Sequence, residues 1–175
     1  MQHSSLLFLL WGGVTGCKDA DPVSGCSYSI IRFGQIVDDN YFDEVLPVGT
    51  YSISLDGATI TFASDSTTIV VTKNGDTYTV VKDGTEVQET NIITTEYDSA
   101  METFEKASYT FDNGNCTLDW GNASEYYEGD IFTGTYTVSD NTLIITYSGQ
   151  NPITATTSDN WETFELGALK CKLKQ

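Results

Sequence analysis

The stretch GTYSISLDGATITF, residues 49–62, decides the fold class. Tyr51, Ile53 and Leu55 alternate with serine residues, and the residues after the dipeptide Asp56-Gly57 alternate in the same way. Alternation places the apolar side chains on one face of a strand. Asp-Gly suits a tight type I′ turn, because both central residues of that turn need a positive φ. The stretch therefore predicts an antiparallel hairpin with one buried face.

The same device recurs along the chain, at Asn74-Gly75, Asp83-Gly84, Asn113-Gly114 and Asp140-Asn141. The strands expected around these turns are 68–73 with 76–81, 76–82 with 85–90, 108–112 with 115–120, and 135–139 with 142–147. Consecutive hairpins predict an antiparallel meander of about ten to twelve strands. Long open meanders leave unpaired edges, so they tend to close or to split into two sheets. We predict an all-β domain that closes into an up-and-down β-barrel of about 8–12 strands, with a two-sheet β-sandwich as the alternative.

Residues 95–106, TTEYDSAMETFE, are the exception to this pattern. They are polar and alternate poorly, so we expect a loop or one or two turns of helix there. We expect no long helix, because no stretch of the sequence shows a sustained 3.6-residue period of apolar residues.

The N-terminus begins with a short apolar run, residues 6–14. It is too short to span a bilayer as a helix, which needs about 20 residues, but its length is typical of the apolar part of a signal peptide. We therefore expect residues 1–16 to be a signal peptide, residues 17–26 a lipidated tether, and residues 27–175 a single β-barrel domain.

The sequence Val14-Thr15-Gly16-Cys17 resembles a bacterial lipobox. The resemblance implies cleavage before Cys17 and attachment of a diacylglyceryl group to the Cys17 sulfur. Residues 18–22, KDADP, resemble the signal that sends some Gram-negative lipoproteins to the outer face. The first five residues, MQHSS, depart from the family because they contain no Lys or Arg. We expect an exported protein, lipid-anchored at the outer membrane or cell surface.

Residues 107–147 resemble the lipocalin-like domains of small bacterial lipoproteins, through their Asn-Gly hairpin and a Gly-x-Tyr-x-Val-x-x-Asn-x-Leu-x-Ile hairpin that begins at Gly134. The Gly-x-Trp signature of true lipocalins is absent. The resemblance implies a binding domain for a small apolar ligand or a peptide. The aromatic residues that we single out for ligand binding are Trp120, Tyr136 and Trp161.

The charge and the single histidine exclude several classes of function. With 25 acidic and 8 basic residues, the net charge is −17, which repels nucleic acid and is compatible with a basic protein partner. The histidine, His3, lies in the expected signal peptide. The mature domain then has no imidazole for Ser-His-Asp or Cys-His catalysis or for a zinc site. We expect no enzyme activity and no cofactor.

Three hypotheses for function remain open. The first is a surface or outer-membrane lipoprotein whose lipocalin-like domain binds a small apolar ligand or peptide. The second is an acidic protein–protein interaction module of the inhibitor or adhesin type. The third is a carbohydrate-associated lipoprotein.

Three cysteines remain if Cys17 is lipidated. Cys116 and Cys171 fall on apolar faces of their expected strands, so they either form a disulfide that joins the last strand to the middle of the sheet or remain two separate buried thiols. Cys26 is expected to be free or to pair with a partner.

One acidic segment of the chain, residues 38–43, contains candidate metal ligands. Asp38, Asn40 and Asp43 supply the oxygen ligands that calcium prefers, but the segment has no complete calcium-loop pattern. We therefore favour a solvated acidic loop and predict no metal site.

Overall fold

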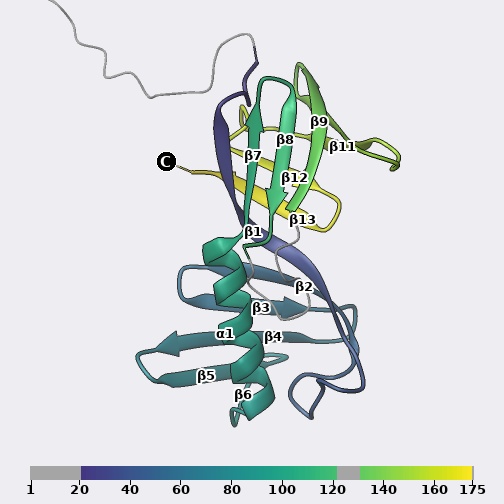
Figure 1. The fold of residues 1–175 in the computed structure, drawn as a ribbon. Helices are drawn as coiled ribbons and strands as arrows, with labels where there is room; N and C mark the ends of the chain where they lie inside the picture. The colour runs from purple at the N-terminus through teal and green to yellow at the C-terminus, as the bar shows by residue number, and fades with distance from the viewer. Residues whose placement is uncertain (1–20, 122–130, 175) are drawn as a thin grey trace, which may run out of the picture.

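The computed structural model describes residues 21–121 and 131–174. Within these residues the protein has two lobes joined by a narrow waist (Figure 1). The upper lobe is a closed antiparallel barrel, and the lower lobe is an antiparallel sheet with a helix on one face. One long strand, β1 (Cys26–Val37), runs through both lobes.

The barrel has eight strands. Besides β1 they are β7 (Ser108–Asp112), β8 (Asn115–Asp119), β9 (Ile131–Ser139), β10 (Thr142–Tyr147), β11 (Ile153–Thr156), β12 (Thr163–Leu166) and β13 (Leu169–Leu173). Neighbours along the chain pair from β7 to β13, and β13 then pairs with β1, where Tyr28 lies opposite Leu173. The predicted all-β barrel is confirmed.

The lower lobe is built from the C-terminal half of β1 and from residues 49–106, which lie outside the barrel. The C-terminal half of β1 pairs with β2 (Gly49–Asp56), followed in order by β3 (Thr59–Ala63), β4 (Thr68–Asn74), β5 (Thr77–Lys82) and β6 (Thr85–Val87). The helix α1 (Asn91–Lys106) covers one face of this sheet and leads back to the barrel at β7. The described residues thus form thirteen strands, and the barrel accounts for only part of the 27–175 segment.

A β-bulge in β1 lets one strand serve two lobes. The pairing with β13 shifts register between Ile30 and Arg32, so one extra residue is inserted there. Before the bulge, Tyr28 and Ile30 are buried in the barrel, and after it Phe33 and Val37 are buried in the lower lobe. Because side chains alternate between faces, one extra residue is enough to redirect the buried face of the strand.

The predicted hairpins form, and Asp83-Gly84 and Asn113-Gly114 have two positive φ angles each, as a type I′ turn requires. At Asp140-Asn141 only Asp140 has a positive φ, of 50°. The other two turns lie one residue later than predicted, because Asp56 pairs with Thr59 and Asn74 pairs with Thr77, so the type I′ prediction at Asp56-Gly57 was wrong. The strand predicted at 85–90 is shorter, because β6 ends at Val87 and Thr90 caps the following helix.

The expectation of no sustained helical period was wrong. The helix α1 has 16 residues, and the Thr90 side chain accepts a hydrogen bond from the backbone N–H of Ile93 at its start. Ile93, Tyr97, Ala100 and Phe104 are buried, and their spacing of four, three and four residues is that of one helix face. Nowhere in residues 21–121 and 131–174 is a helix long and apolar enough to cross a lipid bilayer.

Candidate functional site

The interior of the barrel, where a lipocalin-like protein would hold its ligand, is filled by aromatic rings. Tyr28, Tyr109, Phe111 and Phe164 are almost completely buried. The Tyr109 and Phe111 rings stack with centroids 4.9 Å apart, and Phe164 meets Tyr28 edge-on at 4.9 Å. Such distances are those of rings in direct contact. The barrel interior is therefore a packed core.

The hydroxyl groups inside this core are paired. The Tyr28 hydroxyl donates to the Trp161 carbonyl oxygen at 3.0 Å, and the Tyr109 and Tyr147 hydroxyls hydrogen-bond to each other. Burial raises the pKa of Tyr28 and the pKa of Tyr109 above their ordinary values. In the part of the chain that the structure describes, no buried side-chain nitrogen or oxygen lacks a partner. The core therefore offers no spare polar group to a ligand.

The disulfide alternative for Cys116 and Cys171 was wrong, because both are free, buried thiols. Cys116 lies in β8 and Cys171 in β13, with β7 and β1 between them in the barrel wall. Three strand spacings of about 4.8 Å exceed the Cα separation that a disulfide can bridge. Burial raises the pKa of Cys171 to about 12 and also raises the pKa of Cys116. Both are thiols, not thiolates, at neutral pH and are poorly reactive.

Cys26 is disulfide-bonded, so of the two expectations for it, a free thiol or a paired one, the free thiol was wrong. The expected lipidation site, Cys17, lies outside the described residues. The described part of the predicted tether is packed against the barrel. Val23 is fully buried, and Asp21 Oδ1 accepts hydrogen bonds from the backbone N–H groups of Val23 and Ser24 at 3.2 Å each.

The three aromatic residues predicted to bind a ligand do not form one site. Trp161 is buried in the barrel core, and Tyr136 is also buried, with its hydroxyl donating to Asp21 Oδ2 at 2.7 Å. Trp120 lies at the waist, where its ring meets Phe33 edge-on at 6.2 Å. Their roles are structural in this arrangement.

Two carboxylates of the acidic segment, those of Asp38 and Asp43, stabilise the loop by accepting hydrogen bonds from its backbone. Asp38 Oδ1 accepts a hydrogen bond from the Asn40 N–H at 2.9 Å, and Asp43 Oδ1 accepts from the N–H groups of Val45 and Leu46 at 2.9 and 2.7 Å. Among residues 21–121 and 131–174, no group of three or more His, Cys, Asp or Glu side chains is arranged to hold a metal ion.

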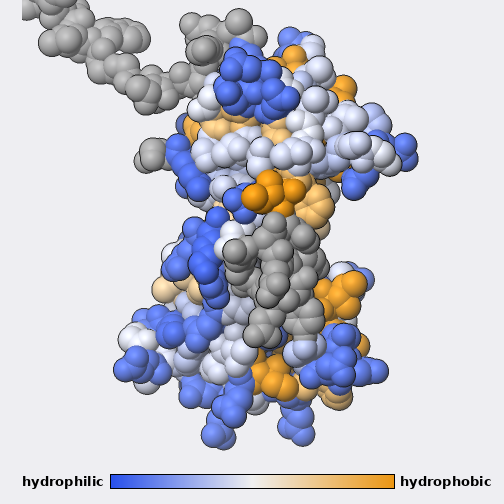
Figure 2. All heavy atoms as spheres, viewed as in Figure 1, coloured by the Kyte–Doolittle hydropathy of each residue, from blue (hydrophilic) through white to orange (hydrophobic). Residues whose placement is uncertain are grey.

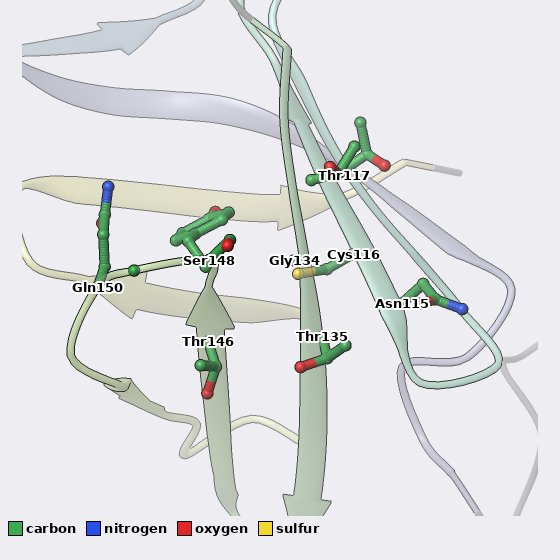
Figure 3. Close-up of a pocket in the computed structure, with 11 residues that line it drawn as sticks. Asn115, Cys116, Thr117, Gly134, Thr135, Thr146, Ser148 and Gln150 are labelled. Carbon is green, nitrogen blue, oxygen red and sulfur yellow. The ribbon is translucent and has the colours of Figure 1, made fainter.

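An open groove of about 650 Å³ lies on the outer wall of the barrel, across β8, β9 and β10 (Figure 3). Its lining consists of Asn115, Cys116, Thr117, Thr133, Gly134, Thr135, Thr146, Tyr147, Ser148, Gly149 and Gln150. Most of these residues carry a hydroxyl or amide group, although more of the lining surface is apolar than polar, and no side chain in the lining is charged at neutral pH. The groove can offer hydrogen bonds to an uncharged polar group, but the Tyr147 ring is buried and cannot stack on a sugar.

Gly134 allows the strands to meet closely at this groove. A Cβ atom there would lie 2.7 Å from the Thr146 carbonyl oxygen and 3.0 Å from the Tyr147 ring. Gly134 was predicted from the sequence as the start of a hairpin motif. The groove was not predicted, because residues from three different strands, β8, β9 and β10, form it together.

Comparisons with known protein families, with curated protein sequences and with solved structures found no match. The geometry of the chain is thus the basis for a functional proposal.

Proposed function

We propose that the protein is a lipid-anchored surface module that binds a basic protein partner through its outer surface. The observation that carries the proposal is the filled barrel. The packed rings of Tyr28, Tyr109, Phe111 and Phe164, in stacked and edge-on contact, occupy the space that a small apolar ligand would need. Of the three hypotheses from the sequence, the acidic interaction module therefore has the most support, and the carrier of an apolar ligand has the least.

Charge supports a basic partner. A net charge of −17 creates a field that attracts cationic proteins and speeds their association at low ionic strength. The same field disfavours nucleic acid and anionic lipid. The groove beside Gly134 gives some support to a carbohydrate-associated role, but it lacks the exposed aromatic ring on which sugars commonly stack.

The lipid anchor is proposed at Cys17, from the lipobox. Support comes from the way the described chain begins. Asp21 and Val23 are fixed to the end of the barrel, so a lipid four residues before Asp21 would hold that end close to a membrane. The lower lobe lies at the opposite end of the molecule (Figure 1) and would then face away from the membrane.

Intact-mass and native mass spectrometry of protein taken from its own membranes tests both parts of the proposal. We expect a chain that begins at Cys17, a lipid mass on that residue and no small apolar molecule bound in the barrel. Cys17→Ser should release the protein from the membrane fraction, whereas the control Cys26→Ser should keep it there. A chain that carries no lipid on Cys17 would contradict the anchor. A stoichiometric apolar ligand would contradict the packed-barrel argument.

A further inference from the structure

Four large apolar side chains are exposed around the loop that joins β1 to β2. Ile36 is 75% exposed, Val48 51%, Phe42 47% and Tyr41 43%. We call these four residues the end patch. Figure 2 shows hydrophobic residues gathered on one side of the lower lobe, beside hydrophilic ones. An exposed group of this kind commonly marks an interaction surface.

Strand pairing places two of these residues on one face of the sheet. Ile36 lies opposite Thr50, and Val37 lies opposite Gly49. Val48 is two residues before Thr50, so it continues the face that carries Ile36. This is the face opposite the buried one, which Val37 marks. Tyr41 and Phe42 lie in the loop between Ile36 and Val48.

The loop that carries the aromatic pair is fixed in place. Leu46 is fully buried, and Asp43 caps the backbone of Val45 and Leu46. The Thr90 hydroxyl donates to Asp43 Oδ2, which ties the loop to the start of α1. A surface that is already ordered loses little conformational entropy when it binds, so its contacts contribute more to affinity.

The rim of the end patch is acidic. Asp38, Asp39 and Glu44 are exposed in the same loop, and residues 33–72 contain no Lys or Arg. Lys82 contacts this loop from β5, and its Nζ donates a hydrogen bond to the Glu44 carbonyl oxygen. An apolar centre with a carboxylate rim is complementary to an apolar contact ringed by basic side chains.

We propose that the end patch is the docking site of a basic protein partner, whose contact face presents apolar side chains surrounded by Lys and Arg. This inference rests on the proposed function. A second copy of the chain is disfavoured, because a symmetric contact would bring two acidic rims together. An anionic membrane is disfavoured because it would repel the same carboxylates. The loop between β1 and β2, which carries the patch, also lies at the far end of the molecule from the start of β1, where a partner could reach it (Figure 1).

Selection from a displayed peptide library on the folded protein tests the site. We expect enriched peptides to combine aromatic or aliphatic residues with Lys or Arg. The double variant Tyr41→Ser/Phe42→Ser should weaken their binding about tenfold or more, because buried aromatic contacts dominate interface affinity. The matched control Ile131→Ser/Ile144→Ser removes two exposed apolar side chains from the barrel wall and should leave binding unchanged.

A second pair of variants separates the rim from the overall charge. Asp39→Asn/Glu44→Gln should weaken binding a few-fold and make it less dependent on salt. Asp76→Asn/Glu105→Gln removes the same charge from exposed positions outside the loop and should have a smaller effect.

The outcomes distinguish the site from the function. Enriched peptides that ignore Tyr41 and Phe42 would overturn the end patch but leave an interaction module in place. Failure to enrich any peptide would contradict both. Dimers that disappear with Tyr41→Ser/Phe42→Ser in analytical ultracentrifugation would assign the patch to self-association. Co-sedimentation with phosphatidylglycerol vesicles that depends on the same residues would assign it to a membrane. Either result would overturn the proposal.

Discussion

At Gly134 the barrel wall has no room for a side chain. A methyl group there would meet the Thr146 carbonyl oxygen at 2.7 Å, a distance that backbone movement alone can relieve. We expect Gly134→Ala to lower the free energy of unfolding by about 1–3 kcal/mol, as overpacking does in other cores. Urea unfolding followed by tryptophan fluorescence measures this change.

Gly49→Ala is the control for this substitution. Its added methyl group would lie 3.5 Å from the Tyr51 ring, which is ordinary contact. If both glycine variants lose the same stability, the close approach at Gly134 is not the cause.

The Asp159 carboxylate should make the stability of the barrel depend on pH. Hydrogen bonds from the Thr163 and Thr157 side chains lower the pKa of Asp159 from its ordinary value of 3.8 to about 2. A lowered pKa in the folded state contributes stability above pH 3.8, and this contribution is lost as the pH falls towards 2. We expect the wild type to lose more stability than Asp159→Asn over this range in thermal unfolding. Asp76→Asn, which removes the same charge from an exposed turn, should follow the wild type.

Single residues also show what the sequence could reveal. Asp83, Asn113 and Asp140 were predictable as turn residues, because a tight turn depends on only two central residues and their φ angles. The places of Trp120, Tyr136 and Trp161 were not, because their partners are distant in the sequence. The Trp161 carbonyl, for example, pairs with the hydroxyl of Tyr28, 133 residues away.

At the scale of elements, β1 joins the lobes through Phe33, just after the bulge. The Phe33 ring meets Phe104 of α1 at 5.1 Å and Trp120 at 6.2 Å. We expect Phe33→Ala to lower the free energy of unfolding by about 3–5 kcal/mol, since it leaves a cavity at the waist. Chemical unfolding measures the loss.

Ile36→Ala is the matched control on the same strand, because Ile36 is 75% exposed whereas Phe33 is 8% exposed. It should change stability by about 0.5 kcal/mol or less. Equal losses for the two variants would mean that Phe33 does not hold the lobes together.

The helix α1 shows how an element can be missed. Ile93, Tyr97, Ala100 and Phe104 do carry a helical spacing, but threonine and acidic residues between them hide it in a chain rich in strand formers. The bulge in β1 and the pairing of β1 with β13 could not be predicted from the sequence either. Both depend on contacts between residues 26–32 and residues 169–173, which are far apart in the chain. Local hairpins and the closure of the meander were predictable from the sequence, but the strand pair that closes the barrel, β1 with β13, was not.

At the scale of the whole molecule, the two candidate surfaces differ in origin. The groove beside Gly134 lies across three barrel strands, and its lining is neutral. The end patch comes from a loop that the lower lobe holds out, and its rim is acidic. The start of β1 lies at one end of the molecule, and the apolar loop with its acidic rim lies at the other (Figure 1). This arrangement is consistent with a packed barrel that supports the loop and presents it to a partner.

The net charge of −17 should also govern the stability of the whole molecule. Like charges lie closer together in the folded state than in the unfolded chain, so their repulsion destabilises the fold. Sodium chloride screens this repulsion, with a Debye length of about 10 Å at 0.1 M and about 3 Å at 1 M. The four described ion pairs, Arg32–Glu165, Lys73–Asp98, Lys106–Glu102 and Lys170–Glu165, are partly exposed and contribute little against it.

We therefore expect added sodium chloride to raise the thermal unfolding midpoint at pH 7. The effect should disappear near pH 4.1, the isoelectric point, because the net charge is then close to zero. Differential scanning calorimetry at both pH values measures the two slopes, and chloride is preferred to sulfate because sulfate strengthens apolar burial by itself. A midpoint that falls with salt at pH 7 would mean that attractive ion pairs, and not repulsion among the 25 acidic residues, dominate the electrostatics of the fold.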